Sequence, residues 1–182
     1  MKNEFDFDYS SGNFREQYSI LKKVEKWMEL FKKPYDFNSL LLLAAEIGDV
    51  ALIEFSLKKG ANIEVQDGVS LQSASQNGHL NAVKYLLKRG ADIHAGEDAA
   101  LRSASRSGRL DIVKYLVESG ADIHARNDGA LQDAVGYGNL EIFKYLLDQG
   151  ANIHAIDKYG LRLARRNKEF KVVKYLESLR GK

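Results

Sequence analysis

A four-residue phrase recurs along this chain at a constant interval of 30 residues. It reads GANI, GADI, GADI and GANI, and it opens at Gly60, Gly90, Gly120 and Gly150. A constant period of about 20–50 residues is typical of stacked arrays, in which each unit buries its apolar face only against its neighbours. Arrays of this kind provide long binding surfaces and seldom form catalytic pockets. The sequence therefore predicts a repeat architecture.

The units align without a gap when they are written as residues 38–67, 68–97, 98–127, 128–157 and 158–182. Leucine, alanine and glycine recur at fixed places in each unit, and an aromatic residue recurs near its end. These columns are Leu41, Leu71, Leu101, Leu131 and Leu161; Ala44, Ala74, Ala104, Ala134 and Ala164; Gly48, Gly78, Gly108 and Gly138; and Phe55, Tyr85, Tyr115, Tyr145 and Tyr175. We predict four full repeats and a C-terminal capping repeat.

The spacing within each unit predicts two short helices. In the second unit the first helix is expected at about 70–77, where the small Ala74 lets a neighbouring helix approach closely. Gly78 ends it, because glycine tolerates the left-handed conformation found at helix ends. The second helix is expected at about 80–89, before Gly90, and its apolar residues follow helical spacing: Leu80, Val83, Leu86 and Leu87. A turn then returns the chain to the next unit.

The segments NGHLNAVKYLLKRGADIHA (77–95) and SGRLDIVKYLVESGADIHA (107–125) resemble the second helix and loop of the ankyrin repeat. The resemblance recurs in every unit and covers roughly residues 38–182. It implies an all-α solenoid of stacked helix-turn-helix repeats, which usually has a period of about 33 residues. Here the period is 30 and Val-Ser-Leu-Gln (69–72) replaces the usual Thr-Pro-Leu-His opening, so we expect abbreviated hairpin loops. The recurring VKYL and ADIHA sequences are similar to ankyrin proteins encoded by large DNA viruses of amoebae.

The two ends of a solenoid need caps, because a terminal unit has a neighbour on one side only. In the last unit Lys168 replaces the glycine, and we predict that Asn167 adopts the left-handed turn instead. Near the N-terminus, Leu42 and Leu43 stand where later units carry polar residues, so they need a cover.

Residues 14–33 provide the predicted cover, because their apolar side chains follow helical spacing: Phe14, Tyr18, Leu21, Val24, Trp27, Met28 and Phe31. We interpret residues 14–37 as an N-terminal capping helix and linker, a degenerate zeroth repeat whose helix ends before Pro34. Residues 1–13 are expected to form a disordered tail. The alternative is that 14–33 is an amphipathic helix for a partner or a membrane.

Composition narrows the class of function. Lys and Arg number 27 against 25 acidic residues, a net charge of +2, so no global field attracts nucleic acid or an anionic membrane. The absence of cysteine excludes disulfides and zinc–thiolate sites and fits a reducing intracellular compartment, cytoplasmic or nuclear. The longest apolar run, Leu40–Ala45, is far too short to span a bilayer, and residues 1–13 are unlike a secretory signal.

Three histidines recur with the period, at His94, His124 and His154. Neighbouring packed helices stand ~8–10 Å apart, whereas zinc ligands lie only ~2 Å from the metal, so we expect these side chains to structure the loops. The aromatic column is expected to form a ladder of ring pairs between repeats instead of a platform for bases. Lys84, Lys114, Lys144 and Lys174 mark a solvated outer face, whose acidic neighbours dilute its field, and this disfavours nucleic-acid binding.

No catalytic constellation stands out, because the chain lacks a glycine-rich phosphate loop and a Ser/His/acid set that the array would bring together. We therefore predict no enzyme activity, no metal site, no cofactor and no small-molecule substrate. What remains is the set of columns that vary from unit to unit and are free for recognition.

In the ankyrin arrangement, the end of the first helix and the loop line the concave side. Tyr and Arg are enriched at binding hot spots, so the first choices are Arg102, Arg106, Arg126, Tyr137 and Tyr159. The full predicted partner-binding set is Gln76, Asn77, Glu97, Asp98, Arg102, Arg106, Arg126, Asn127, Tyr137, Asp157, Lys158, Tyr159 and Arg166. We predict a monomeric protein–protein interaction module whose partner is a protein, a host-cell protein if the chain is viral. The alternative is an architectural protein that self-associates through its apolar N-terminal segment.

Overall fold

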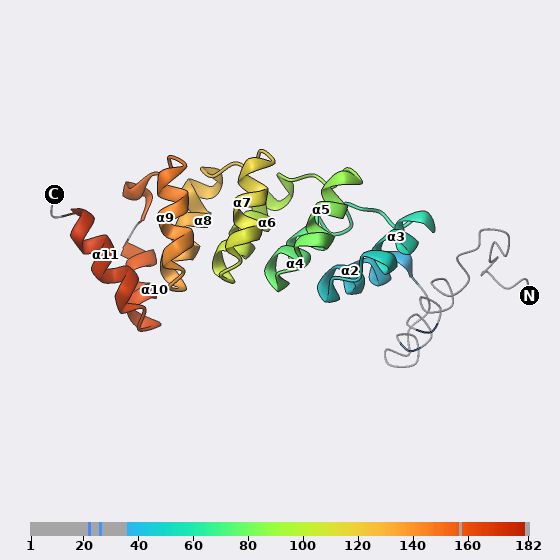
Figure 1. Ribbon diagram of the computed structural model, residues 1–182, viewed down its shortest axis with the longest axis horizontal. Helices are drawn as coiled ribbons and strands as arrows, with labels where there is room; N and C mark the ends of the chain where they lie inside the picture. Colours follow the sequence, from blue (N-terminus) through green and yellow to red (C-terminus); the bar gives the residue numbers. More distant parts are fainter. Residues whose placement is uncertain (1–21, 23–25, 27–35, 157, 181–182) are drawn as a thin grey trace, which may run out of the picture.

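The computed structural model describes residues 22, 26, 36–156 and 158–180. Within these residues the regular elements are helices, which come in pairs along an elongated array (Figure 1). The pairs are α2 (Phe37–Ile47) with α3 (Val50–Lys58), α4 (Val69–Asn77) with α5 (Leu80–Lys88), α6 (Ala95–Arg106) with α7 (Leu110–Glu118), α8 (Ala125–Gly136) with α9 (Leu140–Asp148), and α10 (Lys158–Arg166) with α11 (Phe170–Arg180); a 3-10 turn, η1 (Ile153–Ala155), precedes the last pair. The predicted all-α solenoid is confirmed.

The first helices of the pairs pack closely into one row. Their alanine column, Ala44, Ala74, Ala104, Ala134 and Ala164, is fully buried. A methyl side chain lets neighbouring helix axes approach closely. The second helices, which lie in front of the first in Figure 1, pack against one another much less. Because an array curves toward its more closely spaced row, we call the row of first helices the inner face and the other row the outer face.

The core is a continuous layer between the two rows. The first helices contribute the leucine column and the second helices contribute branched or aromatic residues. The most deeply buried of these are Leu41, Leu71, Leu101 and Leu131, and Ile53, Val83, Val113 and Phe143. Each such side chain contributes about 1.5–3 kcal/mol when it is removed from water. Stability therefore arises from contacts between adjacent units, as expected for a solenoid.

Glycine ends the first helix of each full repeat, as predicted. These glycines are Gly48, Gly78, Gly108 and Gly138, with φ between 73° and 88°. In the last unit the prediction for Asn167 is wrong, because Lys168 itself takes the left-handed conformation with φ of 63°. Asn167 donates its side-chain amide to the carbonyl of Gly136 at 2.8 Å instead. That bond ties the last unit to the preceding one.

Each connecting loop is joined to the preceding repeat by a side-chain acceptor. The backbone N–H of Asp122 donates to Asp98 Oδ1 at 2.8 Å, and that of Asn152 donates to Asp128 Oδ1 at 2.8 Å. The same carboxylates receive histidine contacts. The Nδ1 atoms of His94 and His124 lie 3.2 and 3.1 Å from the Oδ1 atoms of Asp98 and Asp128. These two histidines therefore structure the loops, as predicted.

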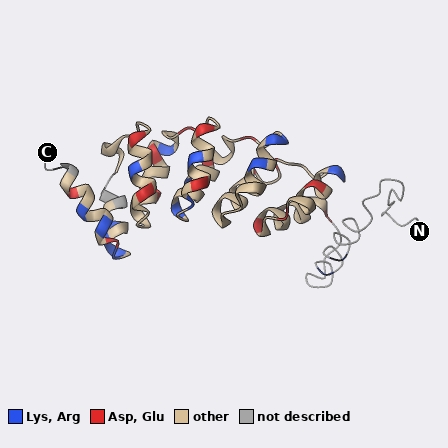
Figure 2. Cartoon of the chain, viewed as in Figure 1, with Lys and Arg blue, Asp and Glu red and all other residues tan. Residues whose placement is uncertain are grey.

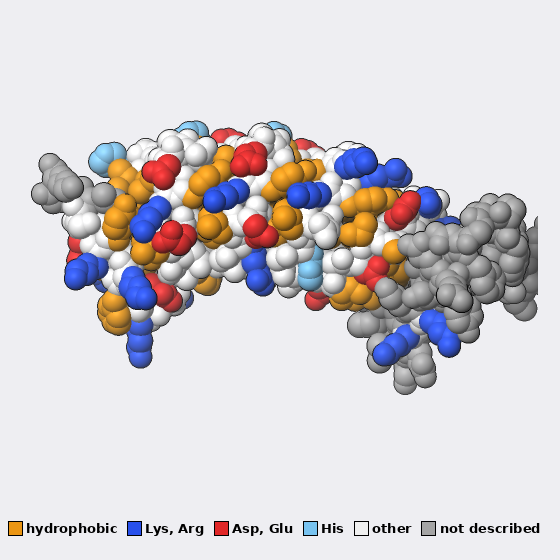
Figure 3. Space-filling view, viewed as in Figure 1, with side chains coloured by type: hydrophobic (Ala, Val, Ile, Leu, Met, Phe, Trp, Pro, Cys, Tyr) orange, Lys and Arg blue, Asp and Glu red, His pale blue; other side chains and the backbone are white. Residues whose placement is uncertain are grey.

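The outer-face lysines lie over the aromatic ring of the next repeat. The distances from Nζ to the ring centre are 5.3 Å for Lys84 and Tyr115, 5.7 Å for Lys114 and Tyr145, and 5.5 Å for Lys144 and Tyr175. Figure 3 shows the resulting alternation of basic and apolar side chains on this face. The prediction of ring pairs within this column is therefore wrong for the described residues: cation–π contacts of about 0.5–1 kcal/mol link neighbouring repeats instead.

Most of the predicted N-terminal cap lies outside the described residues. Lys22 and Lys26 are helical and exposed, while the rest of 14–35 and the tail 1–13 are not described. Leu42 and Leu43, the side chains that the cap is expected to cover, are half-buried. The cap therefore stays a prediction.

Candidate functional site

Three of the predicted arginines line one pocket on the inner face. Arg102 and Arg106 come from consecutive turns of α6, and Arg126 comes from the start of α8. The pocket has a volume of about 290 Å³. The remaining lining residues are Gly129, Gln132, Asp133 and Leu163. Small-molecule sites usually measure about 300–1,000 Å³, so this pocket lies at the lower edge of that range.

Arg106 is held between an acid and an aromatic ring. Its Nε donates to Asp133 Oδ1 at 3.3 Å, and its Nη2 donates to the two carboxylate oxygens at 3.1 and 3.2 Å. The guanidinium also lies 5.4 Å from the ring centre of Tyr137, which is 43% exposed. Burial raises the pKa of Asp133, and Arg106 opposes that rise. The ion pair therefore fixes a cation and an aromatic surface at the rim of the pocket.

Arg102 is the cation of the pocket that has no carboxylate partner among the described residues. Its Nη2 and Nε donate to two backbone carbonyls of the preceding loop at 3.0 and 3.3 Å. The nearby carboxylates are engaged elsewhere, since Asp133 accepts from Arg106 and Glu97 lies 3.3 Å from Arg126 Nε. Burial lowers the pKa of Arg102, and the positive charge of Arg126 lowers it further. A negative group entering from outside would offset both effects.

One predicted contact residue, Asp98, is unavailable to a partner. It is only 3% exposed, because its carboxylate accepts from the backbone of Asp122 and contacts His94. The prediction that Asp98 belongs to the binding surface is therefore wrong. The variation in its column, from Asn38 through Gly68 to Asp98, reflects different ways of holding the loop.

The other predicted residues lie beyond the pocket lining. The exposed side chains are those of Gln76 and Asn77 at the end of α4, Asn127 in the first turn of α8, and Arg166 at the end of α10. Glu97 is exposed and borders the pocket through its contact with Arg126. Lys158 and Tyr159 begin α10 with side chains outside the described part, and Asp157 is not described. The structure thus brings together Arg102, Arg106, Arg126, Glu97 and Tyr137.

Sequence reasoning missed four lining residues, two of which carried a readable signal. Asp133 is the acidic member of a column that otherwise holds Leu43, Ser73, Ser103 and Leu163. Gly129 is the smallest member of a column that otherwise holds Ser39, Val69, Ala99 and Tyr159. An acidic side chain and a missing side chain in the same unit together predict a polar hollow. This signal is found when each column is searched for the unit that differs from the others.

Outside the pocket, the described surface is mixed in charge (Figure 2). Lys and Arg are interleaved with Asp and Glu along the helices (Figure 2). Among the described residues no three His, Asp or Glu side chains are placed to hold a metal ion. None of the described helices is both long and apolar enough to cross a membrane.

Replacing Arg106 by alanine should destabilise the protein in a pH-dependent way. At neutral pH we expect a loss of about 1–2 kcal/mol, because the carboxylate of Asp133, whose side chain is 16% exposed, loses its partner. The raised folded-state pKa of Asp133 means that the folded protein holds its proton more readily. The stability that Asp133 contributes through its raised pKa is therefore fully present below its unfolded-state pKa of about 3.9. It is lost as the pH rises through the folded-state pKa.

Removing Arg106 should raise that folded-state pKa further, so the loss should shrink as pH falls toward about 4. Urea unfolding of the wild type and Arg106→Ala at the two pH values measures the difference. Arg166→Ala, an exposed arginine at the same column of the last unit, is the matched control. A loss for Arg106→Ala that is equal at both pH values would contradict the role given to Asp133.

The family of the chain follows from these helix pairs and from comparison with known proteins. The family model described as ankyrin repeats (three copies) matches residues 25–97, 41–127 and 96–157 of the 182 residues. A search of curated proteins found no match. Because the family match is general, the similarity to viral ankyrin proteins stays a prediction. The matches span more than half of the chain and agree with its stacked helix pairs, so the chain belongs to the ankyrin repeat family.

Proposed function

We propose that this chain is a non-enzymatic, intracellular module that binds a protein partner on its inner face. Ankyrin repeats are generally protein–protein interaction modules and typically non-catalytic, which supports this class of function. The observation that carries the proposal is the pocket of Arg102, Arg106 and Arg126 with Tyr137 at its rim. Arg and Tyr are the residue types that dominate binding energy at protein interfaces.

The site suits binding because its side chains are already held in place. Arg106 is fixed by Asp133 and packs on Tyr137, while Arg102 is fixed by the carbonyls of the loop. Ordering a long side chain on association costs about 0.5–1.5 kcal/mol, and a preorganised site avoids most of that cost. The rigid stacking of α6, α8 and α10 supports the whole arrangement.

Tyr137→Ala is the sharpest test of the inner face. A partner captured with the wild-type chain should bind this variant about fivefold or more weakly, the effect of a hot-spot residue worth ~1 kcal/mol. Tyr137 is the better choice for a single change, since Arg106→Ala also alters stability. The double variant Tyr137→Ala/Arg106→Ala should bind more weakly still. Calorimetric titration measures the affinities, and circular dichroism checks the fold.

The outer-face variants Lys114→Ala and Lys144→Ala serve as controls, because the contacts of these lysines lie on the outer face, with a ring of the next repeat and, for Lys144, also with Glu141. Their affinities should stay close to that of the wild type. Loss of binding in the lysine variants, with the Tyr137 variant unaffected, would show that the inner face is not the site. A concentration-dependent dimer that disappears on deletion of residues 14–33 would favour the architectural alternative.

A further inference from the structure

We propose that the inner-face pocket receives the carboxylate of an Asp or Glu side chain from an acidic segment of the partner, with Arg102 as its main donor. This inference rests on the proposed function and names the chemistry of the segment that binds there. Three properties of the pocket support it: its unpaired hydrogen-bond donors, its local charge and its shape.

The donors of Arg102 are only partly used. A guanidinium has five N–H groups in a fixed fork that matches a carboxylate. The described residues provide two acceptors for Arg102, both of them neutral backbone carbonyls. Arg106 and Arg126 already have the carboxylates of Asp133 and Glu97. The remaining donors of Arg102 are therefore the ones that an incoming carboxylate would meet.

The local charge fits one carboxylate better than a phosphate. Three guanidinium groups face two carboxylates, which leaves one unbalanced positive charge. A carboxylate carries one negative charge, whereas a phosphorylated side chain carries about 1.5 to 2 at neutral pH. The second charge of a phosphate would lie beside Asp133 and Glu97 and be repelled by them.

The shape of the pocket depends on Gly129. A Cβ atom added there would lie 2.9 Å from Arg102 Cδ and 3.3 Å from Arg126 Cβ, so even a methyl group would displace the arginines. Leu163, on α10, supplies an apolar wall. The exposed ring of Tyr137 stands beside Arg106 and offers a surface for an apolar neighbour of the acidic residue. An acidic side chain next to an apolar one therefore matches the site.

The test selects short random peptides displayed on phage against the full-length protein, followed by fluorescence polarisation with the enriched peptides. We expect enrichment of Asp or Glu next to an apolar residue. Arg102→Gln should weaken binding roughly tenfold or more. The fold should survive, because glutamine stands in the same column at Gln72 and Gln132. Changing the peptide acid to its amide should produce a similar loss on the wild type and little further loss on Arg102→Gln.

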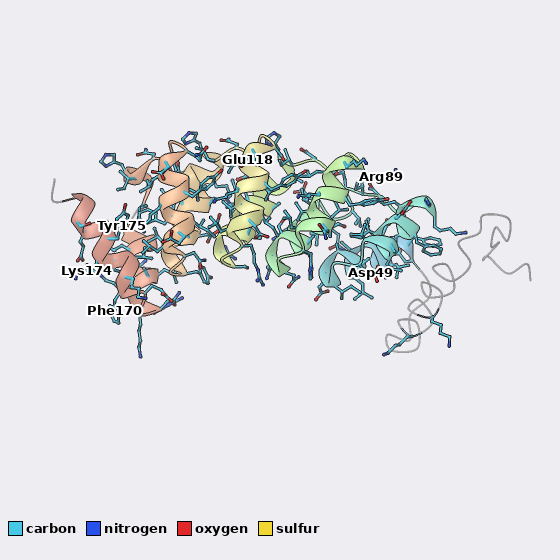
Figure 4. The ribbon with its side chains drawn as sticks, viewed as in Figure 1. Asp49, Arg89, Glu118, Phe170, Lys174 and Tyr175 are labelled. Atoms are coloured by element: carbon cyan, nitrogen blue, oxygen red, sulfur yellow. The ribbon has the colours of Figure 1, made fainter. Side chains whose placement is uncertain are left out.

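Two variants separate shape from charge. Gly129→Ala keeps every charge but pushes the Arg102 side chain out of its position, and it should weaken binding to a similar degree. Arg89→Gln removes the same charge at the end of α5, outside the pocket lining (Figure 4), and should leave affinity nearly unchanged.

Several results would overturn the proposal. Failure to enrich peptides, enrichment without acidic residues, or equal binding by Arg102→Gln and the wild type would each do so. If enriched peptides depend on Tyr137 but not on Arg102, the inner-face function stands and the carboxylate pocket falls. Displacement of the peptides by inorganic phosphate at lower concentration than by acetate would assign the pocket to phosphate. Binding of a peptide of residues 1–13, lost in Arg102→Gln, would make this chain itself the occupant.

Discussion

Phe143→Ala should lower the free energy of unfolding by about 3–5 kcal/mol, the usual cost of emptying a buried phenylalanine site. Phe143 is fully buried on α9, and its ring meets that of Tyr175 on α11 edge-on at 5.8 Å. The other units carry Ile53, Val83, Val113 and Val173 in this column. The larger ring therefore buries more apolar surface at the junction with the last unit, and its removal would leave a cavity between two repeats.

In a solenoid each unit contacts only its neighbours, so the loss should be felt most in the last repeat. Urea unfolding followed by circular dichroism measures the total, and amide hydrogen exchange should speed up in α10 and α11 before it does in α4 and α5. Phe143→Leu, which keeps most of the apolar volume, should cost clearly less. A loss below about 1 kcal/mol for Phe143→Ala, or faster exchange spread evenly over the array, would contradict this view of the junction.

The repeat fold could be predicted from the sequence because packing dictates its columns. Ala74 and Leu71 recur in each unit, since the inner row accepts only those sizes, and the structure buries both. The end of a helix could be predicted where a glycine follows it, as at Gly78. The end at Lys168 was missed, because a lysine in the left-handed region carries no signal of its own. Its conformation is imposed by the unit it closes.

The left-handed turns between repeats, two of which lie at the starts of α6 and α8, were also not predictable from local sequence. Three successive residues have φ between 54° and 73° in each of the turns at 66–68, 96–98 and 126–128. Only some of them are glycine, and a left-handed residue with a side chain costs about 1–2 kcal/mol. Local preference therefore argues against these turns. Two of them are held by bonds from residues 24 positions away, from Asp122 to Asp98 and from Asn152 to Asp128, and such bonds are invisible to local patterns.

Only part of the candidate site could be predicted, because variation between units has more than one cause. Variation between units identified Arg102, Arg106 and Arg126 as surface residues, and the structure places all three around one pocket. The same criterion also selected Asp98, which varies because it holds the loop and is buried. Variation between repeats thus marks both recognition and alternative loop chemistry, and only burial separates the two.

Asp128→Ala should cost about 3 kcal/mol of stability and also disturb the pocket. Asp128 is 4% exposed, and its Oδ1 accepts from the backbone N–H of Asn152 at 2.8 Å. A hydrogen bond to a charged group is worth about 1.5–3 kcal/mol. Alanine would also have to adopt the φ of 55° found here, which adds about 1–2 kcal/mol before relaxation. Arg126 and Asn127 precede it in the same turn, so the rim of the pocket depends on this bond.

The chain itself supplies the controls for that change. Asn38 stands in the same column and accepts from the backbone N–H of Asn62 at 2.7 Å, so Asp128→Asn should cost no more than about 1 kcal/mol. Gly68 also stands in this column, where Glu64 of the same loop accepts from the next repeat instead. Asp128→Gly should therefore fall between the other two, because it removes the backbone strain without restoring an acceptor. Urea unfolding of the three variants should give the order Asn, Gly, Ala from least to most destabilised. Equal losses for Asn and Ala would mean that the carboxylate oxygen does not hold the loop, and that Arg126 owes its position to other contacts.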